Sequence, residues 1–337
     1  MACYHPLTAY GKMNEETGKM KIVFPNKFNK VEPSEEYLKS QGVEKLKLPC
    51  GNCVGCRLEY SRQWAIRCFF EAKQWKHNYF VTLTYNDEHI PLRLHCKVDP
   101  LTGEVSDMSD VMTLDPPALS LFIKRLRTNM QRRNGHTGIR FFGCGEYGPL
   151  NMRPHYHLIL FNCPLDDLKV DKVENGYTYY RSEFIEKTWG KGFVTVTDFS
   201  FETAAYVARY VLKKHKGKDR YYYEDKGIEP EFTRCSRRPG IAYQYFDENE
   251  DRIYSFDEVF FVNGKGKPLK VKPPKYFDRL FDIDHPSAMV YIKERRKDTA
   301  LNSMDYALQQ TDLDEDAYLC VKENNKVLSV QKLKRGL

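Results

Sequence analysis

Two apolar-rich runs separated by a turn-prone segment constrain the fold of this sequence most. The runs cover residues 139–144 and 155–161, and Gly145-Glu-Tyr-Gly-Pro149 lies between them. Glycine and proline in so short a connection favour a tight turn. We therefore expect the two runs to be neighbouring strands of one antiparallel sheet.

Other segments add strands and helices in a definite order. A β-branched and aromatic run, Phe80–Tyr85, predicts a buried strand, and apolar residues at helical spacing after Asp115-Pro-Pro117 predict a helix. Further along, we expect a short helix over 182–188, a strand over 193–197 and a helix over 201–215. This order indicates an α+β sandwich with one antiparallel sheet.

Turn-rich boundaries divide the chain into three regions. Residues 1–76 form a cysteine-bearing N-terminal region that ends in a basic helix over 57–76, whose charged face is either solvated or in contact with DNA. Residues 77–216 contain the predicted sandwich. Residues 217–337 form an accessory region of unknown role, with a hairpin expected over 253–262 and helices after it.

Charge and composition suit a polyanionic partner without requiring one. Lysine and arginine total 53 against 46 acidic residues, and many of the 23 tyrosines lie close to basic residues. This mixture is expected where bases stack and phosphates are neutralised. The sequence has neither an apolar run of 18 residues nor the core of a signal peptide at its start. We therefore expect no membrane partner and a location in the cytoplasm.

His155-Tyr156-His157 carries the first candidate chemistry. Side chains at i and i+2 of a strand project to the same face, so the two imidazoles point together while Tyr156 points to the opposite face. Two neighbouring imidazoles are half of a divalent metal site, although such a pair can also be structural or exposed. Glu146, at the end of the preceding strand, could complete a three-ligand Mg²⁺ or Mn²⁺ site, or be an exposed turn glutamate.

The second candidate motif is Tyr206-Val-Ala-Arg-Tyr210-Val-Leu-Lys-Lys214. Tyr206 and Tyr210 share a helix face at i and i+4, and Arg209, Lys213 and Lys214 lie close by along the helix. Alone, this spacing also fits two core or interface tyrosines. A phenol is a weak nucleophile at neutral pH, so it needs nearby cations and a metal that withdraws charge from the phosphate. The histidine and tyrosine motifs together therefore predict attack of tyrosine on a DNA phosphate.

Three cysteines in Cys50-Gly-Asn-Cys53-Val-Gly-Cys56 have the spacing of a tetrahedral zinc site. A fourth ligand is needed, and Cys3 is preferred, with His5 as the alternative. An iron–sulfur cluster and unliganded buried thiols remain open. Because a closed thiolate shell leaves no position for substrate, we expect this Zn²⁺ to be structural.

The motifs resemble the His-hydrophobic-His (HUH) superfamily of replication initiators and relaxases. They resemble more closely the replication initiator proteins of small single-stranded DNA bacteriophages, the gokushovirus branch of the microviruses. The matching segments are Pro49-Cys-Gly-Asn-Cys-Val-Gly-Cys-Arg57, Phe80-Val-Thr-Leu-Thr-Tyr85, Arg153-Pro-His-Tyr-His157 and Tyr206–Lys214. The likeness covers roughly residues 1–216 and no motif of the remainder.

The resemblance implies an HUH endonuclease, RRM-like fold with four to five antiparallel strands flanked by helices. It implies Glu146, His155 and His157 as metal ligands, Tyr206 and Tyr210 as the nucleophile pair, and Lys214 as a helper. The implied activity is nicking and joining of a hairpin or single-stranded DNA origin, which starts rolling-circle replication. Implied partners are a host helicase and the replication machinery of the bacterial host, in its cytoplasm. Thr82 and Thr84 either line this site or are ordinary strand residues.

Two other functions fit part of the sequence. A transposase or plasmid relaxase of the same superfamily also joins tyrosine to DNA, although the cysteine loop and paired tyrosines favour the phage-type initiator. A non-catalytic protein that binds single-stranded nucleic acid would use the sheet and the tyrosines only to stack bases. Formation of a covalent tyrosine–DNA adduct distinguishes an enzyme from a binding protein.

Overall fold

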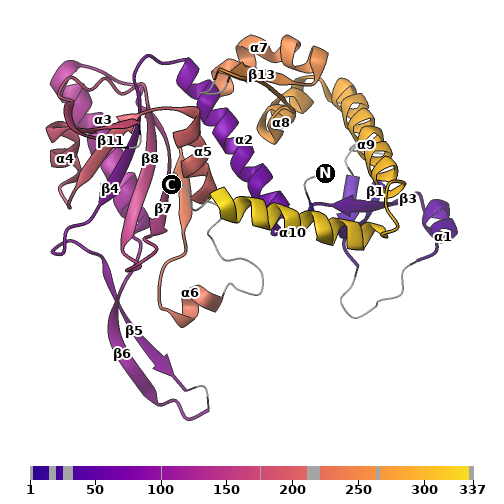
Figure 1. Cartoon of the computed structure of the whole chain (residues 1–337), viewed down its shortest axis with the longest axis horizontal. Coiled ribbons are helices and arrows are strands. Elements are labelled where there is room, and N and C mark those ends of the chain that lie inside the picture. Colours follow the sequence, from indigo (N-terminus) through magenta and orange to yellow (C-terminus); the bar gives the residue numbers. More distant parts are fainter. Residues whose placement is uncertain are drawn as a thin grey trace. The chain divides into compact units, whose positions relative to one another are not determined.

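The computed structural model describes residues 3–14, 20–25, 33–99, 101–174, 176–210, 221–262 and 266–333 of the chain. Contacts between Cα atoms group the chain into two units. One unit combines residues 1–59 with 293–337, and the other comprises residues 60–292. Figure 1 labels the elements of both units.

The larger unit is built on an antiparallel sheet of seven strands, in the order β12-β7-β8-β4-β11-β10-β9. Its strands are β4 (Asn78–Thr84), β7 (Arg140–Tyr147), β8 (Pro154–Phe161), β9 (Lys169–Glu174), β10 (Tyr177–Arg181), β11 (Val194–Asp198) and β12 (Phe232–Cys235). The predicted α+β class with a large antiparallel sheet is confirmed. The expected count of four to five strands is too low, because β9, β10 and β12 extend the sheet at its two edges.

The predicted hairpin between the two apolar-rich runs is confirmed. β7 and β8 pair antiparallel, with Glu146 opposite His155 and Cys144 opposite His157. On the other side of β8, β4 places Thr82 opposite His157. The histidine strand therefore lies between two partners, and both partners contribute side chains to its face.

One face of the sheet is covered by α3 (Pro116–Asn134) and α4 (Glu183–Trp189), as Figure 1 shows. Its core contains Phe122 of α3, Trp189 of α4 and, from β8, Tyr156 and Leu158. The Asp115 side chain accepts a hydrogen bond from the backbone N–H of Ala118 and caps α3, as the sequence predicts. Tyr156 thus points away from the histidine face, as period-2 alternation requires.

The opposite face is covered by α2 (Val54–Lys73) and α5 (Phe201–Tyr210). Cys68 and Ala72 of α2 and Ala204 and Val207 of α5 pack there on the buried strand residues Phe142, Cys144, Ile159 and Phe161. This is the face to which His155 and His157 belong, since they have the same parity as Ile159. Two helices therefore cover the sheet beside the candidate site.

A third buried cluster lies in the same unit, where the predicted hairpin over 253–262 is wrong. Residues up to Phe256 belong to helix α7 (Tyr243–Phe256), and the hairpin is formed by β13 (Val259–Val262) and β14 (Pro268–Val271). Buried Tyr245, Phe246 and Ile253 recur at helical spacing and pack with α8 (Lys275–Asp284). This helical periodicity outweighs the β-propensity of Ile253 and Tyr254.

The remaining elements of residues 60–292 are short, apart from α9 (Pro286–Leu308), which continues beyond residue 292. β5 (Leu92–Val98) and β6 (Val105–Met112) form a separate two-stranded ribbon, and α6 covers Tyr221–Asp225. Figure 1 shows the ribbon extending away from the sheet. Helices after the hairpin are confirmed.

The smaller unit contains a three-stranded sheet of order β2-β1-β3, with β1 Leu7–Met13, β2 Met20–Val23 and β3 Val43–Leu48. Its helices are α1 (Glu35–Ser40) and α10 (Glu315–Leu333). Lys47 of β3 forms an ion pair with Glu315 of α10. Within the described ranges, no helix has the length and apolar character required to cross a membrane.

Candidate active site

Glu146, His155 and His157 converge on one face of the β7–β8 pair. Glu146 and His155 are directly opposite in register, and His157 follows His155 by two residues along the strand. Their ligating atoms all lie within 4.8 Å of one another. The structure therefore brings together all three residues that the sequence predicts as ligands.

Both imidazoles contact the same carboxylate oxygen. Oε1 of Glu146 lies 2.7 Å from Nε2 of His155 and 3.1 Å from Nε2 of His157. Glu146 is only 2% exposed, which rules out the exposed turn glutamate. Burial raises the pKa of this carboxyl group, but hydrogen bonding and charge from the two histidines outweigh burial and lower its pKa to about 2. Glu146 is therefore a carboxylate, the form that binds metals.

The protonation of His155 favours a cation at this position. Its Nδ1 lies 3.1 Å from the carbonyl oxygen of Arg153, which only accepts hydrogen bonds, so Nδ1 carries the proton. In a neutral imidazole Nε2 then holds a lone pair, yet it faces the carboxylate oxygen of Glu146. Two such acceptors need a shared proton or a metal ion. The donor set, one carboxylate and two imidazoles with Nδ1 of His155 held by a carbonyl, fits a divalent metal.

Two residues outside the ligand set orient the histidines. Thr82 Oγ1 lies 2.9 Å from Nδ1 of His157. Arg153 holds the turn before β8 through its guanidinium, which donates to the carbonyl of Tyr85 and to Asp87. The alternation of Thr82 and Thr84 in the first strand was the sequence signal for the threonine contact. No pattern in the sequence indicated the role of the Arg153 backbone.

Tyr206 lies beside this group. Helix α5 begins with reciprocal bonds, in which the Ser200 N–H donates to Thr203 Oγ1 and the Thr203 N–H donates to Ser200 Oγ. Packing of the helix on the sheet then places the half-buried Tyr206 ring 5.6 Å from the His157 ring, centroid to centroid, at 77°. The ring also meets Phe80 of β4 edge to face, at 6.0 Å.

The other members of the tyrosine motif are outside what the structure describes. Position 210 follows Tyr206 by one turn of α5, but only its backbone belongs to the described part of the chain. The same holds for the side chain of Arg209, whereas Lys213 and Lys214 lie wholly outside the described residues. Their roles stay predictions.

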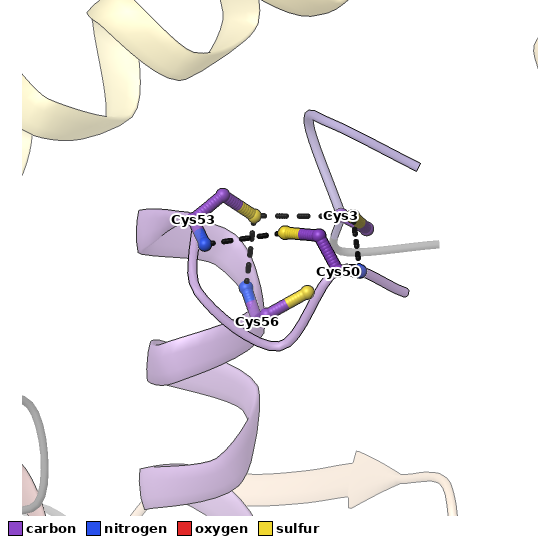
Figure 2. A group of neighbouring side chains, drawn as sticks. All are labelled: Cys3, Cys50, Cys53 and Cys56. Carbon is purple, nitrogen blue, oxygen red and sulfur yellow. Dashed lines mark hydrogen bonds between the residues drawn. The ribbon is translucent and has the colours of Figure 1, made fainter. Parts of the chain in front are cut away.

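A second group of ligating side chains lies in the smaller unit, where Cys3, Cys50, Cys53 and Cys56 gather (Figure 2). Their four Sγ atoms lie within 4.8 Å of one another, and all four thiols are free of disulfides. Cys3 occupies the fourth position that the sequence left open between Cys3 and His5. The His5 ring instead pairs with Glu323 of α10.

Backbone amides donate toward the sulfur atoms of this group, as expected around thiolates. The N–H of Cys50 donates to Cys3 at 3.3 Å, and the N–H of Cys56 donates to Cys53 at 3.4 Å. Burial raises the pKa of Cys53, but hydrogen bonds from the amides of Tyr4 and Cys56 and from neighbouring thiols lower it to about 7. A tetrahedral set of four sulfurs fits Zn²⁺.

The fold and these two groups define a class of α+β proteins in which an antiparallel sheet carries a candidate metal site and a second candidate metal site has four cysteines. Residues 78–215 match the family model for the phage replication-associated protein ORF2. The chain is 38% identical over 309 residues to the replication-associated protein ORF2 of Spiroplasma virus 4, covering 90% of this chain and 88% of that one. No solved structure matches the chain.

Two further relatives extend this likeness. The replication-associated protein VP4 of Bdellovibrio phage phiMH2K is 31% identical over 252 residues, which cover 73% of this chain and 71% of that one. The replication-associated protein ORF4 of Chlamydia phage 1 is 29% identical over 172 residues, 50% of this chain and 38% of that one. The chain belongs to the replication-associated protein family of microviruses.

Proposed function

We propose that this chain is a metal-dependent tyrosine endonuclease that nicks and rejoins single-stranded DNA at a replication origin, and so starts rolling-circle replication. Membership of a family of replication-associated phage proteins supports the role in replication. The chemistry is supported above all by one observation. The ring of Tyr206 lies against His157, within the group that His157 forms with Glu146 and His155.

In the proposed step, a phenolic oxygen of α5 attacks a DNA phosphate. A bond forms between the tyrosine oxygen and phosphorus, and the bond between phosphorus and the 3′ oxygen breaks. The phenol loses a proton and the departing 3′ oxygen gains one. Because the 5′ phosphate stays on tyrosine in a phosphodiester bond, the 3′-hydroxyl can reverse the reaction and rejoin strands without ATP.

Glu146, His155 and His157 would hold Mg²⁺ or Mn²⁺ through one carboxylate oxygen and two Nε2 atoms. Bound there, the ion would withdraw charge from the attacked phosphate. The protein's own part is orientation, because the Arg153 carbonyl and the Thr82 hydroxyl hold the two imidazoles with Nε2 toward Glu146. Positive charge on Lys213 and Lys214 would favour the phenolate of a nearby tyrosine.

A pair of tyrosines would serve two successive cleavages. While Tyr206 or Tyr210 carries the 5′ end of one strand, the other could attack a second phosphate and release a finished circle. We propose no order for the two. A host helicase and the host replication machinery would extend the 3′ end, and the four-cysteine group would hold a structural Zn²⁺.

The test uses a single-stranded origin oligonucleotide labelled at its 3′ end, so that the fragment joined to tyrosine carries the label. The full chain is incubated with Mg²⁺, Mn²⁺ or EDTA, and the covalent adduct is separated on a denaturing gel. Wild type should form the adduct only with metal. The double variant Tyr206→Phe/Tyr210→Phe should form none, and at least one single variant should be defective in joining.

The exposed Tyr291 of α9 offers a matched control, since Tyr291→Phe removes a hydroxyl far along the chain from the motif. Its adduct yield should equal that of wild type. An adduct that persists in the double variant would exclude these tyrosines as nucleophiles. Binding of the oligonucleotide with no adduct under any metal condition would favour a non-catalytic binding protein.

A further inference from the structure

A cavity of about 840 Å³ lies where β7 begins, at the end of that strand remote from Glu146. It is lined by α3, by the end of α2 and by the segment that follows β12. Arg140 opens β7 and Glu146 lies six residues further on, so the two are about 20 Å apart along the strand. The cavity is therefore separate from the candidate active site.

The lining of this cavity is strongly basic. It includes Arg127, Arg140, Arg237 and Arg238, and its only acidic member is Glu71. Glu71 is buried and already paired with Arg140. The formal charge of the lining is therefore +3, which attracts an anion.

Two of the arginines are held in place by the fold. Arg127 donates to the carbonyl of Ile139 and to Ser236 Oγ, while Arg140 donates to the carbonyls of Pro239 and Gly240. Carbonyl and hydroxyl groups are neutral, so these bonds orient the guanidinium of Arg127 without cancelling its charge. A preorganised cation of this kind binds a phosphate at lower entropic cost.

The other two arginines are available to a ligand. Arg237 and Arg238 are exposed, and their side chains form no hydrogen bond or ion pair with any residue that the structure describes. They follow Ser236, which is tied to β7 by hydrogen bonds between its backbone N–H and the Phe141 carbonyl and between the Phe141 N–H and Ser236 Oγ. Two guanidinium groups available to a ligand are thus attached directly to a rigid sheet edge.

Shape and aromatic content favour a single strand over a duplex. The lining also contains Trp75 and Phe141, which can contribute to stacking of a base. A recess of this volume has the size of ordinary ligand pockets and admits a splayed nucleotide, whereas the phosphates of a double helix lie on a wide convex surface.

We propose that this arginine-lined cavity, formed by Arg127, Arg140, Arg237 and Arg238, binds the phosphate backbone of single-stranded DNA at a distance from the cleavage site. This inference rests on the proposed function, because it takes single-stranded DNA as the substrate. At a rise of 3.4 Å per nucleotide, about 20 Å corresponds to roughly six nucleotides. A strand held in the cavity could therefore reach Glu146 only if it extends about that far from the cleaved phosphate.

The test compares wild type with Arg237→Gln/Arg238→Gln by fluorescence anisotropy on single-stranded oligonucleotides. On 20-mers we expect about tenfold weaker binding and a plot of log affinity against log salt that is shallower by about 1.4, at about 0.7 for each lost phosphate contact. On oligonucleotides that extend only about three nucleotides from the cleaved phosphate, binding and adduct yield should match wild type. The variant Arg237→Lys/Arg238→Lys should recover most of the affinity.

The matched control is Lys124→Gln/Arg132→Gln, which removes the same charge from exposed positions of α3 outside the cavity. Equal losses in the control and the cavity variant would overturn the proposal, as would unchanged binding of 20-mers. Full displacement by a deoxynucleoside monophosphate, with no dependence on strand length, would assign the cavity to free nucleotides and also overturn it. Adduct yield on the short oligonucleotides reports separately on the proposed function, because the cavity does not contribute there.

Discussion

The hydroxyl of Thr82 on β4 lies 2.9 Å from Nδ1 of His157 on β8, directly across the sheet in register. This contact fixes the plane of the imidazole ring. With Nδ1 engaged by threonine, Nε2 faces Glu146. One face of a three-strand segment, β4, β8 and β7, thereby supplies the outer contact, a ligand and the carboxylate in a single row.

Replacing Thr82 by the isosteric valine should weaken Mn²⁺ binding by about 10- to 100-fold, the usual cost of losing an outer contact to a metal ligand. Isothermal titration calorimetry of the full chain measures this. Thr84→Val is the matched control, because the Thr84 hydroxyl donates to the carbonyl of Phe193 and not to a histidine. If the two variants bind Mn²⁺ equally well, the threonine contact does not tune the site.

Glu146→Gln should reduce Mn²⁺ affinity by more than about 100-fold, since it removes a ligand and its negative charge and not merely an outer contact. The amide is similar in size to the carboxylate, so the sheet should keep its fold. Mn²⁺ electron paramagnetic resonance measures free and bound metal directly. The exposed Glu174, which pairs with Lys172, gives the control Glu174→Gln. Retained affinity in Glu146→Gln would exclude this carboxylate as a ligand.

The four-cysteine group should contain one Zn²⁺ per chain, measured by elemental analysis of the purified protein. Cys53→Ser should lose the metal, because serine does not supply the soft thiolate that the site requires. His5→Ala and Cys320→Ser should keep it, since the His5 ring pairs with Glu323 and the exposed Cys320 lies outside the group. Loss of zinc from His5→Ala would restore histidine as a ligand.

Tyr156→Phe should lower the free energy of unfolding by about 1–3 kcal/mol, the cost of leaving buried polar groups unsatisfied. The Tyr156 hydroxyl donates to the Asp115 carbonyl at 2.8 Å, accepts from the Asp115 N–H at 3.2 Å and contacts the Tyr85 hydroxyl at 2.8 Å. Urea denaturation at neutral pH measures the change. Metal affinity should not alter, because Tyr156 lies on the face opposite the histidines.

Alkaline pH should destabilise the wild type more steeply than Tyr156→Phe. Burial raises the pKa of Tyr156 to about 12, above the value near 10 of an unfolded chain. The unfolded state therefore loses this proton first, and the stabilisation present below pH 10 declines between pH 10 and 12. In that window the wild type should lose about 1.4 kcal/mol per pH unit more than the variant, measured by urea denaturation. Parallel slopes would contradict the assignment.

Local patterns in the sequence were sufficient for the central strands and for the metal ligands. Residues 139–144 and 155–161 are joined by a short turn, so their pairing needed no information from distant parts of the chain. Once they pair, period-2 alternation places His155 and His157 on one face with Glu146 beside them. The choice of Cys3 as fourth cysteine also came from the sequence, although His5 remained open there.

Tertiary structure decided what depends on contacts between distant segments. β12 joins the sheet through pairing with β7, about 90 residues earlier, and no local pattern specifies such a partner. The hairpin over 253–262 was predicted wrongly because the residues up to Phe256 pack as a helix in a core that the sequence does not display. Likewise, the sequence placed Tyr206 on a helix, but only the packing of α5 on the sheet brings its ring to His157, because side-chain proximity across elements is set by the shared core.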